Sequence, residues 1–438
     1  MPPWFHRSAM KITACGVIKD QTGAIMFAEI TTGPRKSKRA ALLGLGFGAA
    51  ASLLALQSAQ AFNGPTAINI DGGPLGPLAL TGGADGYLYG LSGTGNSANY
   101  GLLGTDKATG AEFLNGLIQV QKASGLLQFT IEVGATNALI LGGKPNSTSV
   151  QTFSTGPLYA GYLTLAPTKS LSISAGQLGS QEGYESGVDW NNANLLTTDI
   201  FAVENSQSRG IEATYTVGPV AATIEYGDGF DTGVWNFVQA LATYTINSNN
   251  VLNVFGATNL GRTGPNAHIY GSATTPYNQS FVGGYGPYYV NSTMLGAYYS
   301  YTMGNLNLVP EVQYVYAKPD AILARASGDL PGKGLYKFSS NFGAALFADY
   351  QFGKSDYSLG GWGEYFTSNG SDNWFINQGA QGVGISVSPT WQDKNLFVRG
   401  DVGLLHLTKF SNNGSRGYGN DGGSRNQADF VVEAGVLF

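Results

Sequence analysis

The chain has 438 residues, of which 12% are charged and 43% hydrophobic, with 64 Gly, 24 Tyr, 22 Phe and a net charge of −5. The charged fraction is about half that of an ordinary soluble protein, which disfavours a surface that faces only water. High Gly and aromatic content with so few charges favours β-strands that turn one face to lipid, because only every second residue of such a strand must be apolar.

The N-terminal region contains a secretory signal pattern. A basic run at 34–39 precedes an apolar stretch at 40–56 and an A-x-A site that ends at Ala61. A membrane anchor is the less favoured interpretation, because the apolar stretch is shorter than the roughly 20 residues that span a bilayer. We therefore expect three parts, namely an untranslated or non-functional extension at 1–25, a signal peptide at 26–61 and a mature outer-membrane domain at 62–438.

The mature part is acidic and has no cysteine. Residues 62–438 hold 16 Lys and Arg against 26 Asp and Glu, and the single Cys of the chain, Cys15, precedes them. This charge disfavours nucleic-acid binding, and the lack of a thiol excludes disulfides and thiolate chemistry. His268 and His406 accompany no HExxH or GxSxG motif. We expect no enzyme, no cofactor and no metal, with a hydrolase at the outer rim as the least favoured class.

Alternation of apolar and polar residues recurs along the mature part. It begins near 80–92 and is clearest at 125–136, 211–217, 342–350 and 429–438. A soluble β-sandwich would carry more charges between such segments. A membrane barrel is therefore the favoured architecture.

Short and long connections alternate between these segments. Short turns are expected at 122–125, 167–170, 217–219, 247–250, 304–305, 353–356 and 392–395, and long polar stretches at 261–279, 317–334 and 411–427. Seven turns join fourteen strands, and the first and last strands complete the set. The sequence predicts an all-β fold, a transmembrane antiparallel up-and-down β-barrel of about 16 strands, with both ends in the periplasm and room for an aqueous channel.

Aromatic residues gather toward the predicted strand ends. They are Tyr298, Tyr299, Tyr301, Tyr314, Tyr316, Tyr365 and Phe366. Amphipathic rings suit the level of the lipid headgroups, although β-propensity alone explains some of them.

More specific motifs lie in the middle of the chain. GQLG at 176–179, GYE at 183–185, NN at 191–192 with Asn194, and SRGIEATY at 208–215 resemble the OmpL-like β-barrel porin family, and Asp85 with Tyr87 and Tyr89 is similar to its first strand. The resemblance implies a pore in the bacterial outer membrane, with outer-membrane lipid as a partner, and general porins suggest a homotrimer.

The chain ends on an alternating strand whose last residue is Phe438. This end resembles the terminal strand of bacterial outer-membrane barrels, where the last Phe belongs to the signal that the barrel assembly machinery reads. For this strand alone, an ordinary edge strand of a soluble sheet is the alternative.

A pore needs a polar lumen and a constriction whose charges select solutes. Side chains on the polar strand faces are expected to line the lumen: Glu132, Glu212, Glu225, Glu311, Asp349, Glu364, Arg399 and Asp401, with Asp85 a weaker candidate because it shares a face with Tyr87 and Tyr89. The connection at 181–207 holds Glu182, Glu185, Asp189, Asp199 and Glu204 and no basic residue. We expect it to fold inward as an acidic constriction, an exposed surface loop being the alternative.

The function predicted from these features is that of an outer-membrane porin. It would allow passive diffusion of small hydrophilic solutes and ions with a weak preference for cations. A structural or adhesive barrel with a plugged lumen and a substrate-specific channel are the alternatives.

Overall fold

The computed structural model describes residues 64–65, 67–94, 107–143, 145, 147–148, 156–204, 207–264, 289–369, 380–410 and 417–438. The expected extension and signal peptide lie outside these residues, as do parts of the long connections. Within the described ranges no helix has both the length and the hydropathy to cross a bilayer.

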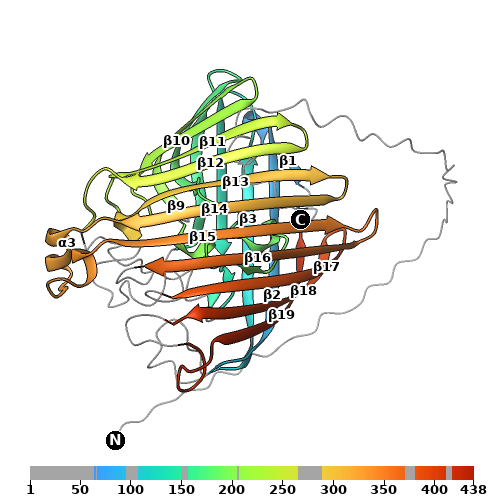
Figure 1. Cartoon of the computed structure of the whole chain (residues 1–438). Helices are drawn as coiled ribbons and strands as arrows, with labels where there is room; N and C mark the ends of the chain where they lie inside the picture. The colour runs from blue at the N-terminus through green and yellow to red at the C-terminus, as the bar shows by residue number, and fades with distance from the viewer. Residues whose placement is uncertain are drawn as a thin grey trace, which may run out of the picture. The chain divides into compact units, whose positions relative to one another are not determined.

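Sixteen antiparallel strands form a closed barrel (Figure 1). They are β2 (Pro77–Leu91), β3 (Thr109–Lys122), β4 (Leu127–Ala135), β6 (Leu158–Leu165), β7 (Leu171–Gly179), β9 (Gln207–Val217), β10 (Val220–Gly227), β11 (Phe237–Asn247), β12 (Asn250–Asn259), β13 (Thr293–Met303), β14 (Leu306–Ala317), β15 (Ser339–Gln351), β16 (Tyr357–Asn369), β17 (Gln381–Asp393), β18 (Leu396–Lys409) and β19 (Asn426–Leu437). Each pairs with the next along the chain, and β19 pairs with β2 to close the cylinder. A further short strand, β1 (Ile68–Asp71), pairs with the first residues of β2.

The strands alternate between exposed apolar and buried polar side chains. On β18, Val398, Val402 and Leu404 are exposed, whereas Arg399 and Asp401 are fully buried. Apolar residues also face outward on other strands, with Leu163 69% exposed on the outer face of the barrel. An outer wall of this composition is stable in lipid and not in water, so the predicted transmembrane barrel is confirmed.

All seven predicted short turns join neighbouring strands, and the long connections join the strands at the other end. Gly218 and Gly304 are the first residues of two-residue hairpin turns. Their φ values are 58° and 62°, a conformation that glycine adopts without steric cost. In bacterial barrels short turns face the periplasm and long loops face outward.

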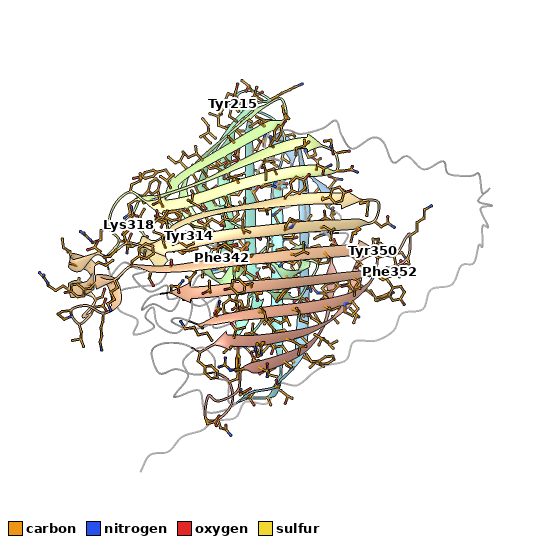
Figure 2. All side chains as sticks on the ribbon, in the orientation of Figure 1. Tyr215, Tyr314, Lys318, Phe342, Tyr350 and Phe352 are labelled. Atoms are coloured by element: carbon orange, nitrogen blue, oxygen red, sulfur yellow. The ribbon has the colours of Figure 1, made fainter. Side chains whose placement is uncertain are left out.

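Aromatic pairs two residues apart share the lipid-facing side (Figure 2). The ring centroids of Tyr314 and Tyr316 are 5.8 Å apart near the long-loop end, and those of Tyr350 and Phe352 are 5.0 Å apart at the opposite end. Tyr298 and Phe366, by contrast, are 2% and 0% exposed and face the interior, so the prediction that both lie at the headgroups is wrong. Neighbouring residues of a strand point to opposite faces, so Tyr298 and Tyr299 cannot both reach lipid.

Candidate pore-lining site

The connection between β7 and β9 lies inside the barrel. It contains two short 3-10 helices, η5 (Asp189–Asn191) and η6 (Phe201–Val203), and the short strand β8 (Leu196–Thr197). Its five carboxylic acids, Glu182, Glu185, Asp189, Asp199 and Glu204, are each at most 9% exposed. We call residues 180–204 the inner loop.

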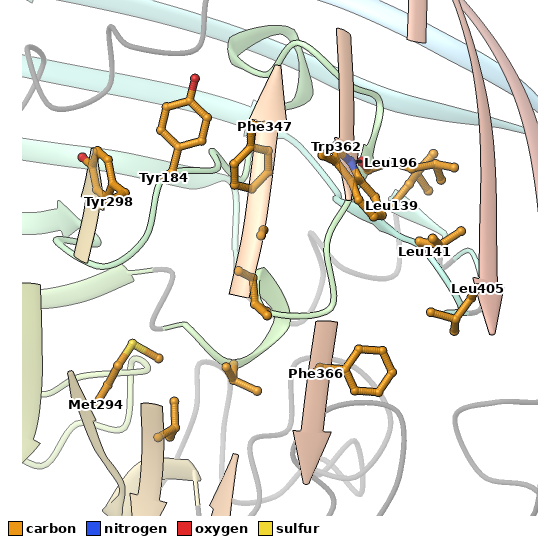
Figure 3. Packing of buried hydrophobic residues seen from close by; sticks show 14 of the residues in the cluster. Leu139, Leu141, Tyr184, Leu196, Met294, Tyr298, Phe347, Trp362, Phe366 and Leu405 are labelled. Carbon is orange, nitrogen blue, oxygen red and sulfur yellow. Dashed lines mark hydrogen bonds between the residues drawn. The ribbon is translucent and has the colours of Figure 1, made fainter. Parts of the chain in front are cut away.

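A second inward segment supports the inner loop. Strand β5 (Leu139–Ile140), from the connection after β4, pairs in parallel with β8. Leu139, Leu141 and Leu196 pack against Trp362, Phe366 and Leu405 of the wall (Figure 3). The interior is therefore partly apolar, whereas alternation predicts a polar lumen. These apolar contacts stabilise the loop inside the barrel.

An ion pair fixes the inner loop to the wall at Asp189. Arg399 of β18 is completely buried, and its Nη2 contacts Asp189 of the loop and lies 2.8 Å from Glu433 Oε2 of β19. Its Nη1 also donates to the Asn192 carbonyl oxygen at 3.0 Å. Because two carboxylates surround one guanidinium, the positive charge of Arg399 is fully compensated.

Asn115 of β3 extends this network to the first strand. Its backbone N–H donates to Asp85 Oδ1 at 2.9 Å, and its side-chain amide donates to Asp85 Oδ2 at 3.0 Å and also to Asp189. The carboxylates of Asp85, Asp189 and Glu433 offer oxygens within 4.8 Å of one another, a spacing that suits a cation. Asn115 and Arg399 donate hydrogen bonds to these carboxylates, so the cation beside them is the Arg399 guanidinium.

Asp401 of β18 holds the middle of the inner loop. It accepts the backbone N–H groups of Leu195 and Leu196, each at 3.0 Å. Ser388 Oγ donates to it at 3.1 Å. Nearby, Trp362 Nε1 donates to the Leu196 carbonyl oxygen at 2.8 Å. A carboxylate that accepts two successive N–H groups orients the loop strongly.

Beyond this anchor, carboxylates face one another across the loop–wall boundary. We call Glu185, Asp199 and Glu204 of the loop, with Glu311 of β14 and Glu364 of β16, the acidic chamber. Glu364 Oε2 accepts the Asp199 N–H at 2.9 Å, and Gln313 Nε2 donates to Glu204 at 3.2 Å. Among the residues that the structure describes, no Lys or Arg forms an ion pair with these five groups.

The acidic chamber alters the titration of the loop groups. Burial raises the pKa of Glu185 to about 8, although Thr198 donates hydrogen bonds that favour the ionised form. Burial, together with the charges of Asp429 and Glu185, holds the pKa of Asp199 well above its usual range. Burial also raises the pKa of Glu204, and the nearby charge of Glu311 raises it further.

A small pocket adjoins the acidic chamber. Its lining includes Tyr184, Glu185, Asn194, Asp349 and Trp362. Asn307 Nδ2 donates to Tyr184 Oη at 3.3 Å, and the Tyr184 and Phe347 rings are 4.9 Å apart. The pocket lining thus combines amides, carboxylates and aromatic faces.

The remaining predicted lumen residues also face inward. Glu212 accepts from Gln181 Nε2, and Glu225 accepts from Gln239 Nε2, both at 2.8 Å. Glu132 faces Gln119 across β3 and β4 at 3.4 Å. These carboxylates therefore bond to neutral amides rather than to cations.

Several interior residues were not predicted from sequence. Glu433 and Asp429 are buried in the inward phase of β19, where alternation signals them. Asn115 gave no such signal, because Leu114 and Asn115 are both buried next to a register shift between Ala84 and Gly86. The inward run of Leu139 to Leu141 has no charge or motif to mark it.

Residues 77–438 match the family model described as Putative beta-barrel porin-2, OmpL-like. Two solved structures share the fold: the anion-selective porin from Comamonas acidovorans (13% identity, TM-score 0.52) and OmpT of Vibrio cholerae in its trimer form (10% identity, TM-score 0.50). Each alignment covers 82% of this chain and 99% of the other. No curated protein sequence matches the chain. The family match over the whole barrel is the decisive comparison: the chain belongs to the OmpL-like β-barrel porin family and is a porin of the bacterial outer membrane.

Proposed function

We propose that the barrel allows passive diffusion of small hydrophilic solutes and ions, with a weak preference for cations. The observation that carries this proposal is the acidic chamber, in which Glu185, Asp199 and Glu204 face Glu311 and Glu364. Above pH 8, where Glu185 is ionised, negative charge at a narrow point raises the local concentration of cations.

The pairing of the basic residues in the interior also supports a preference for cations. Arg399 is compensated by Asp189 and Glu433, and Arg209 lies 2.7 Å from Asp228. Each guanidinium therefore projects little net positive field into the lumen. The anion selectivity of the Comamonas porin belongs to that protein, because 13% identity carries only the fold to this chain.

Two partners belong to the same proposal. The V. cholerae OmpT structure is a trimer form, and we propose that this barrel also assembles as a homotrimer. We propose further that Phe438 is part of the signal read by the barrel assembly machinery. Its backbone N–H donates to Gly82 O at 2.9 Å, so the last residue also belongs to the closure of the barrel.

The test is single-channel conductance of the refolded mature protein in a planar bilayer under a salt gradient. In recordings above pH 8, where Glu185 is ionised, the double variant Glu185→Gln/Glu204→Gln removes charge from the acidic chamber with little change in side-chain size. The control Asp356→Asn/Asp393→Asn removes the same charge from exposed residues near the short turns. We expect the first variant to reduce the cation-directed reversal potential and the control to leave it near the wild-type value.

Two alternatives make different predictions in the same experiment. The apolar contacts of the inner loop favour a plugged structural barrel, which predicts no conductance from protein shown to be folded. The pocket beside Tyr184 and Asp349 favours a substrate-specific channel, which predicts that one class of solute blocks the ion current at low concentration. Equal reversal potentials in wild type and the Glu185→Gln/Glu204→Gln variant would reject the role of the acidic chamber in cation preference. The proposal that the barrel is a pore would stand.

A further inference from the structure

The connection between β14 and β15 forms a small folded lobe at the long-loop end of the barrel. Residues 318–338, here called the basic lobe, contain α3 (Ala321–Ala326) and η8 (Gly334–Tyr336). They carry four basic residues, Lys318, Arg325, Lys333 and Lys337, against two acidic ones, in a mature chain whose overall charge is negative. The lobe is thus a local positive patch on an acidic protein.

Internal contacts give the basic lobe a defined shape. Leu323 and Leu335 are 2% and 1% exposed and pack on each other. Asp320 caps α3 by accepting the Ile322 and Leu323 N–H groups at 3.0 and 2.9 Å, and Arg262 Nε donates to it at 2.6 Å. The exposed side chains of the lobe are therefore held on a fixed support.

The basic lobe continues an aromatic ladder on the lipid-facing wall. Tyr314, Tyr316 and Phe338 follow one another, with ring centroids 5.8 and 5.9 Å apart, and the last pair is stacked. Lys318 continues the outward phase of Tyr314 and Tyr316 beyond the end of β14, and Figure 2 shows it at the same end of the barrel as Tyr314 and Phe342. Lys318 therefore lies at the end of the barrel where these rings form part of the lipid-facing wall.

The positive charges of the basic lobe are available to a ligand. All four basic residues are exposed. Within the described part of the chain, none of them has a carboxylate within 4.0 Å. Ile322 and Leu330, both 63% exposed, add apolar surface beside them.

We propose that the basic lobe and the aromatic ladder beneath it bind the headgroup of a phosphorylated lipid of the outer leaflet. Lys318 and Lys337, which lie next to the wall, would contact the phosphates. Tyr316 and Phe338 would pack against the upper part of the acyl chains and the sugar or glycerol backbone. Apolar rings at the boundary and lysines just above them match the order of groups along such a lipid.

The opposite rim of the barrel provides an internal comparison. Tyr350 and Phe352 form an aromatic pair there, with Lys354 exposed in the adjacent turn. That turn spans only 352–356 and holds one basic residue, against four in the basic lobe. The basic lobe therefore differs from this turn in the number of positive charges that it places beside an aromatic pair.

The experiment measures lipid retention by the folded mature protein in detergent, using native mass spectrometry with bis-phosphorylated lipid A as the probe. Dephosphorylated lipid A and phosphatidylcholine are the comparison lipids. Wild type is compared with Lys318→Gln/Lys337→Gln, with Phe338→Ala, and with the control Lys169→Gln/Lys354→Gln in the short turns. Heat modifiability on electrophoresis shows that each variant is folded.

We expect the phosphorylated probe to bind wild type and the control equally and the Lys318→Gln/Lys337→Gln variant at least about tenfold more weakly, since each basic group near an anionic lipid surface contributes about fivefold. Phe338→Ala should weaken both forms of lipid A. Equal binding of the phosphorylated and dephosphorylated probes, or undiminished binding by the lysine variant, would overturn the proposal. A change of oligomeric state in that variant without retained lipid would instead identify the face as a protein–protein contact.

Discussion

Arg399 and Asp189 form a fully buried ion pair that joins strand β18 to the inner loop. The two residues are far apart in the chain, and the loop that carries Asp189 does not pair with β18 in the sheet. The loop position is thus set by specific charges in addition to apolar packing.

Removal of the guanidinium should destabilise the barrel strongly. In Arg399→Gln the carboxylates of Asp189 and Glu433 lose their cation inside the barrel, which costs about 3 kcal/mol. The control is Arg262→Gln, whose ion pair with Asp320 is partly exposed and is worth about 1 kcal/mol or less. Urea unfolding in lipid vesicles, followed by tryptophan fluorescence, measures both values. Equal effects of the two substitutions would contradict a structural role for the buried pair.

Asp401→Asn should release the middle of the inner loop. The amide cannot accept the Leu195 and Leu196 N–H groups as strongly as the carboxylate does, a loss of about 1–3 kcal/mol. We expect larger and noisier single-channel conductance, because the loop then samples positions away from the wall. Asp393→Asn, at an exposed position beside a short turn, is the matched control. Conductance identical to wild type in Asp401→Asn would show that this anchor does not limit ion flow.

Conductance should also depend on pH through Glu185. Its pKa is about 8 in the docked loop, against 4.5 for the ordinary side chain. Between these values the docked loop holds a proton that an exposed Glu has released, so docking becomes less favourable as the pH rises from 4.5 through 8. Conductance and cation preference should therefore increase over this range in planar-bilayer recordings. Glu185→Gln should flatten that part of the profile, and an unchanged profile would assign the dependence to other groups.

Gly176 should not tolerate a side chain. Its φ is +143°, and a Cβ atom there would lie 2.2 Å from the Gly161 carbonyl oxygen of the paired strand. Gly176→Ala should lower the free energy of unfolding by about 1–3 kcal/mol. Gly90→Ala is the control, because a Cβ at Gly90 meets no atom within 4 Å. The two variants should separate clearly in the urea midpoint, and coinciding midpoints would contradict the steric argument.

The wall of the barrel was predictable because its signals are local. Alternation gives the outward residues, such as Val398 and Val402 on β18, and each short turn contains its own Gly, Pro or Asn. The strand number and the placement of the short turns follow from these two features alone.

The contacts of the interior were less predictable because they join distant segments. The inner loop was expected from its acidic composition, yet its partners Asn115, Asp401 and Glu433 come from both ends of the chain. Aromatic residues such as Tyr298 were assigned to the wrong face, since clustering in sequence does not give the phase of a strand. Asp85 was the weakest lumen candidate and belongs to the most connected network.

The ion network around Arg399 crosses the line along which the cylinder closes. Its wall residues come from β2 and β3 on one side and from β18 and β19 on the other, and Asp189 contacts residues on both sides. Asp189 can hold Asn115 and Arg399 at the same time only when the first strands and the last strands lie side by side. The inner loop is therefore a brace across the closure of the barrel in addition to a lining of its interior.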